Sequence, residues 1–436
     1  MNKKKAKLEL WKARVKNFLR GDFLRAKKLT TNAELAYVIA KNYKRDLVFL
    51  TQDLKKYKAD VSFLQRFKLL PYTDINSQSN NIKDSVVLCD LIEFESKWGL
   101  LNELDFESNV VILLVDDKNE KIEFNEKIKN SLIFDGKGLA GERILICDKG
   151  IRNVCDNLQR KQLKIQAIVT CYNEVDIIGH TIRYLINQGI YVHIIDNWST
   201  DGSGEIIKDF AEKSNYVTSE VFPSDGPSDT FDWAKILKRV QAVAIQNSDK
   251  FDWFIHHDAD EIREAPFGKM KNLKEGIEVV DFCGFNTVNH TVINFALVKD
   301  GFDGKQDLEQ WFEYFEFGEK KNFHHKQLKA WKSNDEIDLV SSGGHIAKFE
   351  NMKIFPYRFL LKHYPLRSIQ QAKRKVFIER KSRWNKEEKQ KDWHKQYDNI
   401  DQNYNFLKNK KDFIKYDRNF IYNKYLIKIV FGIESE

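Results

Sequence analysis

The sequence predicts an α/β protein, in which a mostly parallel sheet flanked by helices is preceded by a smaller α/β domain. Two observations lead to this fold class. From Ile165 onward, short apolar runs typical of strands alternate with segments of helical periodicity, and the connections are short. Several runs are apolar throughout, as in strands covered on both faces. The 436 residues are enough for two or more domains.

The N-terminal segment, residues 3–28, is basic and carries apolar residues at helical spacing. It predicts an amphipathic helix that either packs on its own domain or lies on an anionic membrane surface. Residues 404–431 are also basic with apolar residues at helical spacing, and they too either pack on their own domain or lie on a membrane surface. Because we find neither a membrane-spanning apolar run nor a secretory signal, we expect a cytoplasmic protein, with peripheral contact to the inner face of the cell membrane as the alternative.

Three regions follow from these patterns. Residues 1–160 are expected to form an accessory α/β domain with the basic N-terminal helix, residues 161–400 the main domain, and residues 401–436 a basic, aromatic helical tail. No phosphate-binding glycine loop follows any strand of the first region. Its candidate strands are residues 47–50, 86–91, 110–115 and 143–148.

The main domain contains polar clusters directly after three of its predicted strands. The strands are residues 165–170, 192–196, 217–222 and 252–257. The clusters are "TCYNE" after the first strand, "DNWSTDGS" after the second and "DADE" after the fourth. Because parallel strands end on the same edge of a sheet, where ligands bind, we expect the three clusters to converge.

The "DADE" cluster offers two carboxylates, Asp258 and Asp260, on a turning backbone. Mg²⁺ and Mn²⁺ favour such oxygen ligands and share them with substrate phosphates. The alternative is that an Asp-rich turn only caps the next helix. Asp196, at the end of the second strand, is placed to accept from a nucleobase or a ribose hydroxyl, or else belongs to a plain turn.

The segments "AIVTCYNE", "IIDNWSTDGS" and "DWFIHHDADE", in this order and spacing, resemble the nucleotide-sugar-binding half of the GT-A glycosyltransferases, most of all family 2. Downstream stretches, among them "SSGGHIAKF" and "KHYPLRS", resemble one bacterial branch of that family. The resemblance covers roughly residues 165–400. It implies a GT-A-like fold and an inverting transfer of sugar from a nucleotide-sugar, a UDP-sugar, to a glycan or glycolipid of the bacterial surface, such as capsule or lipooligosaccharide.

The resemblance also implies roles for individual residues. The donor nucleoside would contact Thr170, Tyr172, Glu174 and Asp196. The cofactor, Mn²⁺ or Mg²⁺, would be held on the donor diphosphate by Asp258 and Asp260, with Glu261 orienting the ligands or touching the sugar. A third metal ligand would be His363, with His345 as the second candidate. Arg367 and Lys373 would add positive charge near the diphosphate and so contribute to donor binding.

An inverting transferase needs a carboxylate that deprotonates the acceptor hydroxyl. The candidates downstream of the metal motif are Glu313, Glu316, Asp335 and Asp338, and the sequence does not choose among them. Asp335 and Asp338 lie in a polar segment, whereas Glu313 and Glu316 sit in an aromatic pattern that suggests a helix. Trp331 is the aromatic residue best placed to stack on a sugar, because its neighbours are polar.

Two other functions compete with sugar transfer. A sugar nucleotidyltransferase would also use a parallel sheet and metal carboxylates, but "TCYNEVD" lacks its glycine-rich phosphate loop. A non-catalytic scaffold of a glycan-assembly complex would not need intact Asp258 and Asp260. A nucleic-acid partner is disfavoured, since no recognition module is present and the net charge is only +8. One departure from the family pattern is Trp198, which stands where family members often have glycine.

Overall fold

The computed structural model forms two compact units, unit 1 with Met1–Asp156 and Ile421–Glu436, and unit 2 with Asn157–Phe420. Each unit is treated by itself. The predicted N-terminal helix at residues 3–28 lies outside the described residues. The described residues are 46–50, 67–70, 85–90, 109–115, 128, 130–137, 143–149, 151–153, 162–266, 272–318, 327–383 and 400–432.

Unit 1 contains a six-stranded sheet in the order β2-β1-β3-β4-β6-β5. Strands β2, β1, β3 and β4 are parallel, and β6 runs antiparallel to both of its neighbours. The four predicted strands are confirmed as β1, β3, β4 and β6, while β2 and β5 were not predicted. The bounds are β1 Asp46–Leu50, β2 Phe67–Leu70, β3 Ser85–Asp90, β4 Val110–Val115, β5 Leu132–Lys137 and β6 Arg143–Asp148.

The centre of this sheet is apolar, with Ile112, Leu113 and Ile146 inaccessible to solvent. Two short C-terminal helices, α14 (Arg418–Lys424) and α15 (Leu426–Phe431), follow. Phe431 of α15 packs edge-on against Phe134 of β5, with ring centroids 6.5 Å apart. The end of the predicted helical tail therefore contributes to the core of unit 1.

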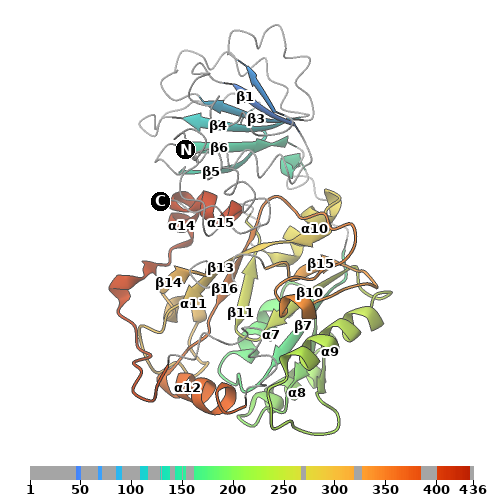
Figure 1. Cartoon of the computed structure of the whole chain (residues 1–436), viewed down its shortest axis with the longest axis vertical. Helices are drawn as coiled ribbons and strands as arrows, with labels where there is room; N and C mark the ends of the chain where they lie inside the picture. Colours follow the sequence, from blue (N-terminus) through green and yellow to red (C-terminus); the bar gives the residue numbers. More distant parts are fainter. Residues whose placement is uncertain are drawn as a thin grey trace, which may run out of the picture. The chain divides into compact units, whose positions relative to one another are not determined.

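Unit 2 begins with the sheet expected from the sequence. Its order is β12-β15-β10-β7-β8-β9, and the four strands β10, β7, β8 and β9 are parallel. The prediction of an α/β fold with a mostly parallel sheet flanked by helices is thus confirmed (Figure 1). The bounds are β7 Ile165–Cys171, β8 Tyr191–Asp196, β9 Val217–Val221, β10 Trp253–Asp258, β12 Thr287–Val288 and β15 Ala330–Lys332.

Three helices connect the parallel strands: α7 (Ile178–Ile186), α8 (Ser203–Lys213) and α9 (Trp233–Gln246). Helix α9 begins at Asp232, whose side chain accepts a hydrogen bond from the amide of Lys235, a typical N-cap. Its apolar stripe packs on β7, β8 and β10, and Trp331 belongs to the same core. Trp331 is fully buried and stacks on Phe254, so our expectation that it faces a sugar is wrong.

A second, five-stranded sheet in unit 2 was not predicted. Its order is β11-β16-β13-β14-β17, and β11 pairs with β16 across at least 96 positions of the chain, as Glu264 does with Leu360. Glu316 lies in β14, where burial alternates with period two, so the suggested helix is wrong there. The bounds are β11 Glu261–Glu264, β13 His290–Phe295, β14 Tyr314–Phe317, β16 Phe359–His363 and β17 Ile414–Lys415.

The remaining helices of unit 2 are α10 (Leu273–Phe282), α11 (Leu308–Trp311) and α12 (Ile369–Lys373). Helix α12 continues as a π-helix over Arg374–Arg380, a form that often occurs at functional sites. Lys375 and Glu379 are buried in it, although the segment is basic. Within the described residues, no helix is both long and apolar enough to span a membrane.

Candidate functional site

A cavity of about 210 Å³ lies in unit 2 at the carboxyl ends of the parallel strands. The ends of β7, β8 and β10 all contribute to its lining, so the expected convergence of the three polar clusters is confirmed. Helix α9, the end of β16 and the π-helix complete the wall. The lining residues are Thr170, Cys171, Tyr172, Glu174, Ile195, Asn197, Phe231, Trp233, Ile236, Asp258, Ala259, Asp260, His363, Pro365, Lys375 and Arg380.

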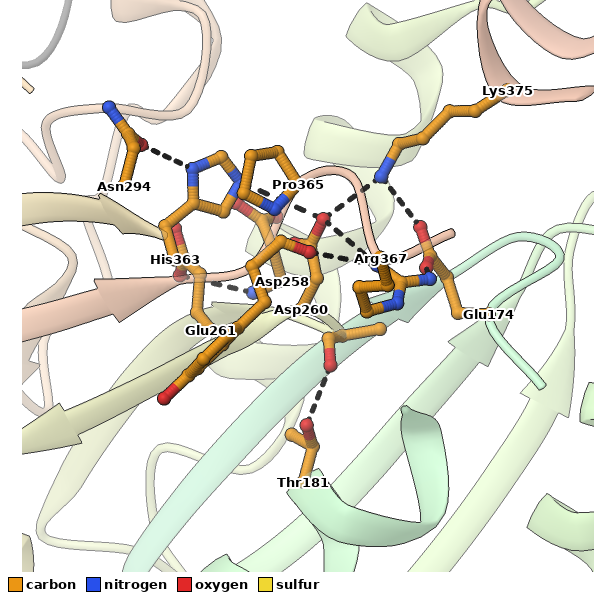
Figure 2. Close-up of polar contacts among 12 residues, drawn as sticks. Glu174, Thr181, Asp258, Asp260, Glu261, Asn294, His363, Pro365, Arg367 and Lys375 are labelled. Atoms are coloured by element: carbon orange, nitrogen blue, oxygen red, sulfur yellow. Dashed lines mark hydrogen bonds and ion pairs between the residues drawn. The ribbon is translucent and has the colours of Figure 1, made fainter. Parts of the chain in front are cut away.

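The turn Asp258–Asp260 joins β10 of the first sheet to β11 of the second. The backbone of this turn is fixed from both sides. The Thr181 hydroxyl of α7 donates to the carbonyl of Ala259 at 2.6 Å, and the amide of Tyr364 donates to the carbonyl of Asp260 at 2.9 Å. The backbone that carries the two carboxylates is therefore held by two hydrogen bonds, of which Figure 2 shows the one from Thr181.

Asp258 is paired with Lys329, a buried residue just before β15. The Lys329 ammonium lies 2.6 Å from the Asp258 carboxylate and 3.2 Å from that of Glu261. The Thr170 hydroxyl also donates to Asp258, at 3.3 Å. Burial alone would raise the pKa of Asp258, but the charge and hydrogen bond of Lys329 together with the His256 ring hold the pKa well below the usual range. Asp258 is thus a carboxylate at neutral pH.

Asp260 has a different set of cations. The Lys375 ammonium lies 2.9 Å from its carboxylate, the His363 ring 3.6 Å away and Arg367 3.9 Å away. Burial opposes ionisation, but Lys375, His363 and Arg367 together hold the pKa of Asp260 far below its usual range. Figure 2 shows Lys375 between Asp260 and Glu174, which it bonds at 3.0 Å.

Glu174 belongs to an ion-pair network centred on the fully buried Arg367. The guanidinium donates to Glu174, to Asp176 at 2.7 and 3.0 Å, and to the carbonyl of Tyr364 at 2.9 Å. Although burial disfavours the charge, the carboxylates of Glu174 and Asp176 raise the pKa of Arg367. Arg367 does not line the cavity, because all its donors point into this network.

His363 has the surroundings of a metal ligand. Its Nδ1 lies 2.8 Å from the Oδ1 of Asn294, which accepts the ring proton and leaves Nε2 on the Asp260 side. Two carboxylates and an imidazole are donors that Mg²⁺ and Mn²⁺ accept, with the remaining ligands drawn from phosphates. The donor types therefore suit a divalent ion brought with a diphosphate. In the described part of the chain, no group of three or more His, Cys, Asp or Glu side chains is arranged to hold a metal ion.

Asp196 is buried and does not reach the cavity. Its carboxylate accepts from the hydroxyl and the amide of Ser199, at 2.5 and 3.3 Å, and so closes the loop after β8. Burial raises its pKa, and the Ser199 hydrogen bonds offset only part of this effect. Its neighbour Asn197 lines the cavity instead. Trp198 adopts a φ of 61°, a left-handed conformation that favours glycine and costs a bulky residue about 1–2 kcal/mol.

None of the predicted base candidates lines the cavity. Glu313 and Asp335 are exposed, and Asp338 accepts a hydrogen bond from the amide of Ser341 at 2.9 Å. Glu261 and Glu316 lie in the second sheet, in one cross-strand row with His363 and Asn294.

The other predicted site residues divide into two groups. Thr170, Tyr172 and Glu174 line the cavity, as the resemblance implied for donor contacts. His345 and Lys373 do not line it: the His345 ring bonds the Gln327 amide at 3.0 Å, and Lys373 is exposed.

Four residues of the site were not predicted: Lys329, Lys375, Arg380 and Asn294. Lys375 and Arg380 stand in "KRKVFIER", where a basic helix next to the "KHYPLRS" segment was the available signal. Asn294 and Lys329 carried no signal, because they reach the site through pairings of the second sheet and of β15 that connect distant parts of the chain.

Residues 166–227 match the family model described as Glycosyl transferase family 2. The matched segment includes the polar ends of β7 and β8, whereas the turn Asp258–Asp260 lies beyond it. A search of curated proteins gave no match.

Solved structures similar to the chain include two glycosyltransferases. The mannosyltransferase PcManGT from Pyrobaculum calidifontis, in complex with GDP-Man and Mn²⁺, is 17% identical over 31% of this chain and 36% of its own, with a TM-score of 0.22. TarS 1-349 from S. aureus, in complex with UDP, is 12% identical over 47% of this chain and 61% of its own, with a TM-score of 0.24.

An N-methyltransferase from Haemonchus contortus, in complex with S-adenosylhomocysteine, is also 12% identical, over 58% of this chain and 82% of its own, with a TM-score of 0.20. Structural similarities this low do not separate the two activities. The family match does: residues 166–227 are similar to family 2 glycosyltransferases, which supports sugar transfer as the activity of unit 2.

Proposed function

We propose that unit 2 transfers a sugar from a nucleotide-activated donor to a hydroxyl group of an acceptor. The observation that carries the proposal is the convergence of three polar strand ends in one cavity. Ligands of parallel α/β sheets bind at this edge. The cavity combines an aromatic wall, which suits a nucleoside, with carboxylates and cations, which suit a metal diphosphate.

In this reaction the acceptor oxygen forms a bond to the anomeric carbon of the sugar. The bond from that carbon to the diphosphate breaks, its electron pair stays on the diphosphate oxygen, and the acceptor proton passes to a base. The site must therefore stabilise negative charge on the leaving diphosphate. Lys375 lies beside the Asp258–Asp260 turn and supplies part of that positive charge.

The metal, Mn²⁺ or Mg²⁺, is proposed to be held by Asp258, Asp260 and His363. When bound, it adds positive charge next to the diphosphate. Asn294 keeps the proton of His363 on Nδ1, and Thr181 keeps the turn in place from below. We also propose, from the resemblance to family 2, that the donor is a UDP-sugar, that the transfer inverts, and that the acceptor is a glycan or glycolipid of the bacterial surface.

Calorimetry on the full chain tests the proposal. UDP is titrated with and without Mn²⁺, into the wild type and into Asp258→Ala. The proposal expects UDP binding that strengthens with Mn²⁺, and loss of that metal dependence in the variant. Release of nucleoside diphosphate from a panel of nucleotide-sugars then identifies the donor. If the wild type binds no nucleoside diphosphate under either condition, the proposed function is wrong.

A further inference from the structure

We propose that Arg380 binds the diphosphate of the donor. The proposal rests on the proposed function and names a residue that neither the sequence motifs nor the family match assigns. Arg380 is the last residue of the π-helix and lines the same cavity as Asp258 and Asp260. It stacks on Phe231, another residue of the cavity wall.

The guanidinium of Arg380 is held in place by stacking rather than by polar partners. Its central carbon lies 4.0 Å from the centroid of the Phe231 ring, a cation–π contact. Phe231 itself is buried, and its amide bonds the carbonyl of Arg383 at 2.6 Å. The stacking fixes the plane of the guanidinium and leaves its N–H groups available for a ligand.

The other cations around the site are each committed to a carboxylate. Lys329 pairs with Asp258 and Glu261, and Lys375 with Asp260 and Glu174. Arg367 pairs with Glu174 and Asp176, and Arg374 with Asp201 and Glu379. Within the described residues, Arg380 forms no ion pair, its guanidinium donates no hydrogen bond, and its buried Nη1 has no partner.

A buried guanidinium N–H without an acceptor is costly, since it loses its hydrogen bonds to water and forms none with the protein. An anion in the cavity removes this cost by accepting those hydrogen bonds. Guanidinium matches the spacing of phosphate oxygens and binds them in pairs. The two carboxylates that line the same cavity, Asp258 and Asp260, already have cations of their own, so the charge of Arg380 is left for the ligand.

Calorimetry on the full chain separates this proposal from a general role in folding or base stacking. Wild type is titrated with UDP, GDP and CDP, and the tightest binder is compared with its nucleoside. In Arg380→Gln we expect nucleoside diphosphate binding to weaken roughly tenfold to a hundredfold, with nucleoside binding about unchanged. Arg380→Lys keeps the charge and should retain part of the affinity.

Arg183→Gln is the matched control. Arg183 also lies over a phenylalanine, Phe210, but is exposed on α7 and outside the cavity, so its loss should leave both affinities unchanged. Equal weakening of nucleoside and diphosphate binding in Arg380→Gln, or unchanged diphosphate binding, overturns the role of Arg380 while the proposed function stands. If no nucleoside diphosphate binds to wild type, it is the proposed function that fails.

Discussion

The two sheets of unit 2 supply different parts of the candidate site. The first sheet, with β7, β8 and β10, provides the floor of the cavity and Asp258. The second sheet, with β11, β13 and β16, provides a polar row formed by Glu261, His363 and Asn294. The first sheet is local in sequence and mostly parallel, while the second is assembled from distant segments.

The Asp258–Asp260 turn connects the two sheets, and its two carboxylates have different partners. Asp258 is partnered by Lys329, which lies just before β15 of the first sheet. Asp260 is partnered by Lys375 of the π-helix and faces His363 of the second sheet. Two residues that look equivalent in the sequence therefore have different environments, and substitutions should tell them apart.

Acid should destabilise both sheets together, and this is the largest effect we predict. Burial lowers the pKa of His256 to about 3 and also lowers the pKa values of His257 and His290. Histidine in an unfolded chain titrates near 6.5. The contribution of these three neutral histidines to folding stability is therefore complete above pH 6.5 and is lost progressively as the pH falls below it. Three such groups cost about 4 kcal/mol per pH unit in that window.

Urea unfolding at pH 7, 6 and 5.5 measures this loss. Asp258 and Asp260 have lowered pKa values, so their contribution disappears only below about pH 4 and does not enter the window. His290→Asn keeps a donor for the carbonyl of Gln327 and should reduce the pH slope by about a third. An equal free energy of unfolding at pH 7 and 5.5 would contradict the conclusion that these buried histidines stay neutral in the folded protein.

On the side of the second sheet, Asp260→Leu should cost about 3–5 kcal/mol of unfolding free energy. The reason is that Lys375 and Arg367 stay buried after losing a carboxylate. Urea unfolding measures the cost. Adding Lys375→Met should recover part of it, because the uncompensated charge is then gone. Strictly additive costs of the two substitutions would show that the pair is not coupled.

On the side of the first sheet, Asp258→Leu should cost less, about 1–2 kcal/mol. The Asp258 side chain is 29% exposed, against 9% for that of Asp260, so solvent screens its charge better. Its substitution affects the ion pair with Lys329, whereas that of Asp260 affects both Lys375 and Arg367. The same urea titration compares the two variants directly. A cost equal to or larger than that of Asp260→Leu would remove the distinction between the two sides of the turn.

The smallest expected effect concerns the orientation of His363. Asn294→Leu removes the acceptor for Nδ1 and should weaken Mn²⁺ binding in the presence of UDP about tenfold, as loss of such supporting hydrogen bonds does at metal sites. Free Mn²⁺ is measured by electron paramagnetic resonance. Asn294→Asp preserves an acceptor and should bind nearly as wild type. Wild-type affinity in Asn294→Leu would show that His363 needs no such support.

The sequence was sufficient for the parallel part of the first sheet because β7, β8 and β10 are mostly apolar runs that end in a polar turn. The bounds of β7, β8, β9 and β10 differ from the predicted ones by one residue at most at either end. For the same reason the cavity edge with Tyr172 and Asp258 could be located from the sequence.

The second sheet could not be predicted, because its order depends on pairings between distant segments. β11 has four residues, and its partner β16 begins 95 residues after β11 ends. Glu316 was assigned to a helix since aromatic residues masked the period of two. The partners of the carboxylates were missed for a related reason: a lysine shows its charge in the sequence, but its ion pair depends on the folded chain.

A crystal structure of the full chain with UDP tests the central claim most directly. The account predicts that the nucleotide occupies the cavity at the ends of β7, β8 and β10, with its diphosphate within hydrogen-bonding distance of Arg380 and beside the Asp258–Asp260 turn. A nucleotide bound elsewhere, or bound there with its phosphates directed away from this turn, would contradict the account.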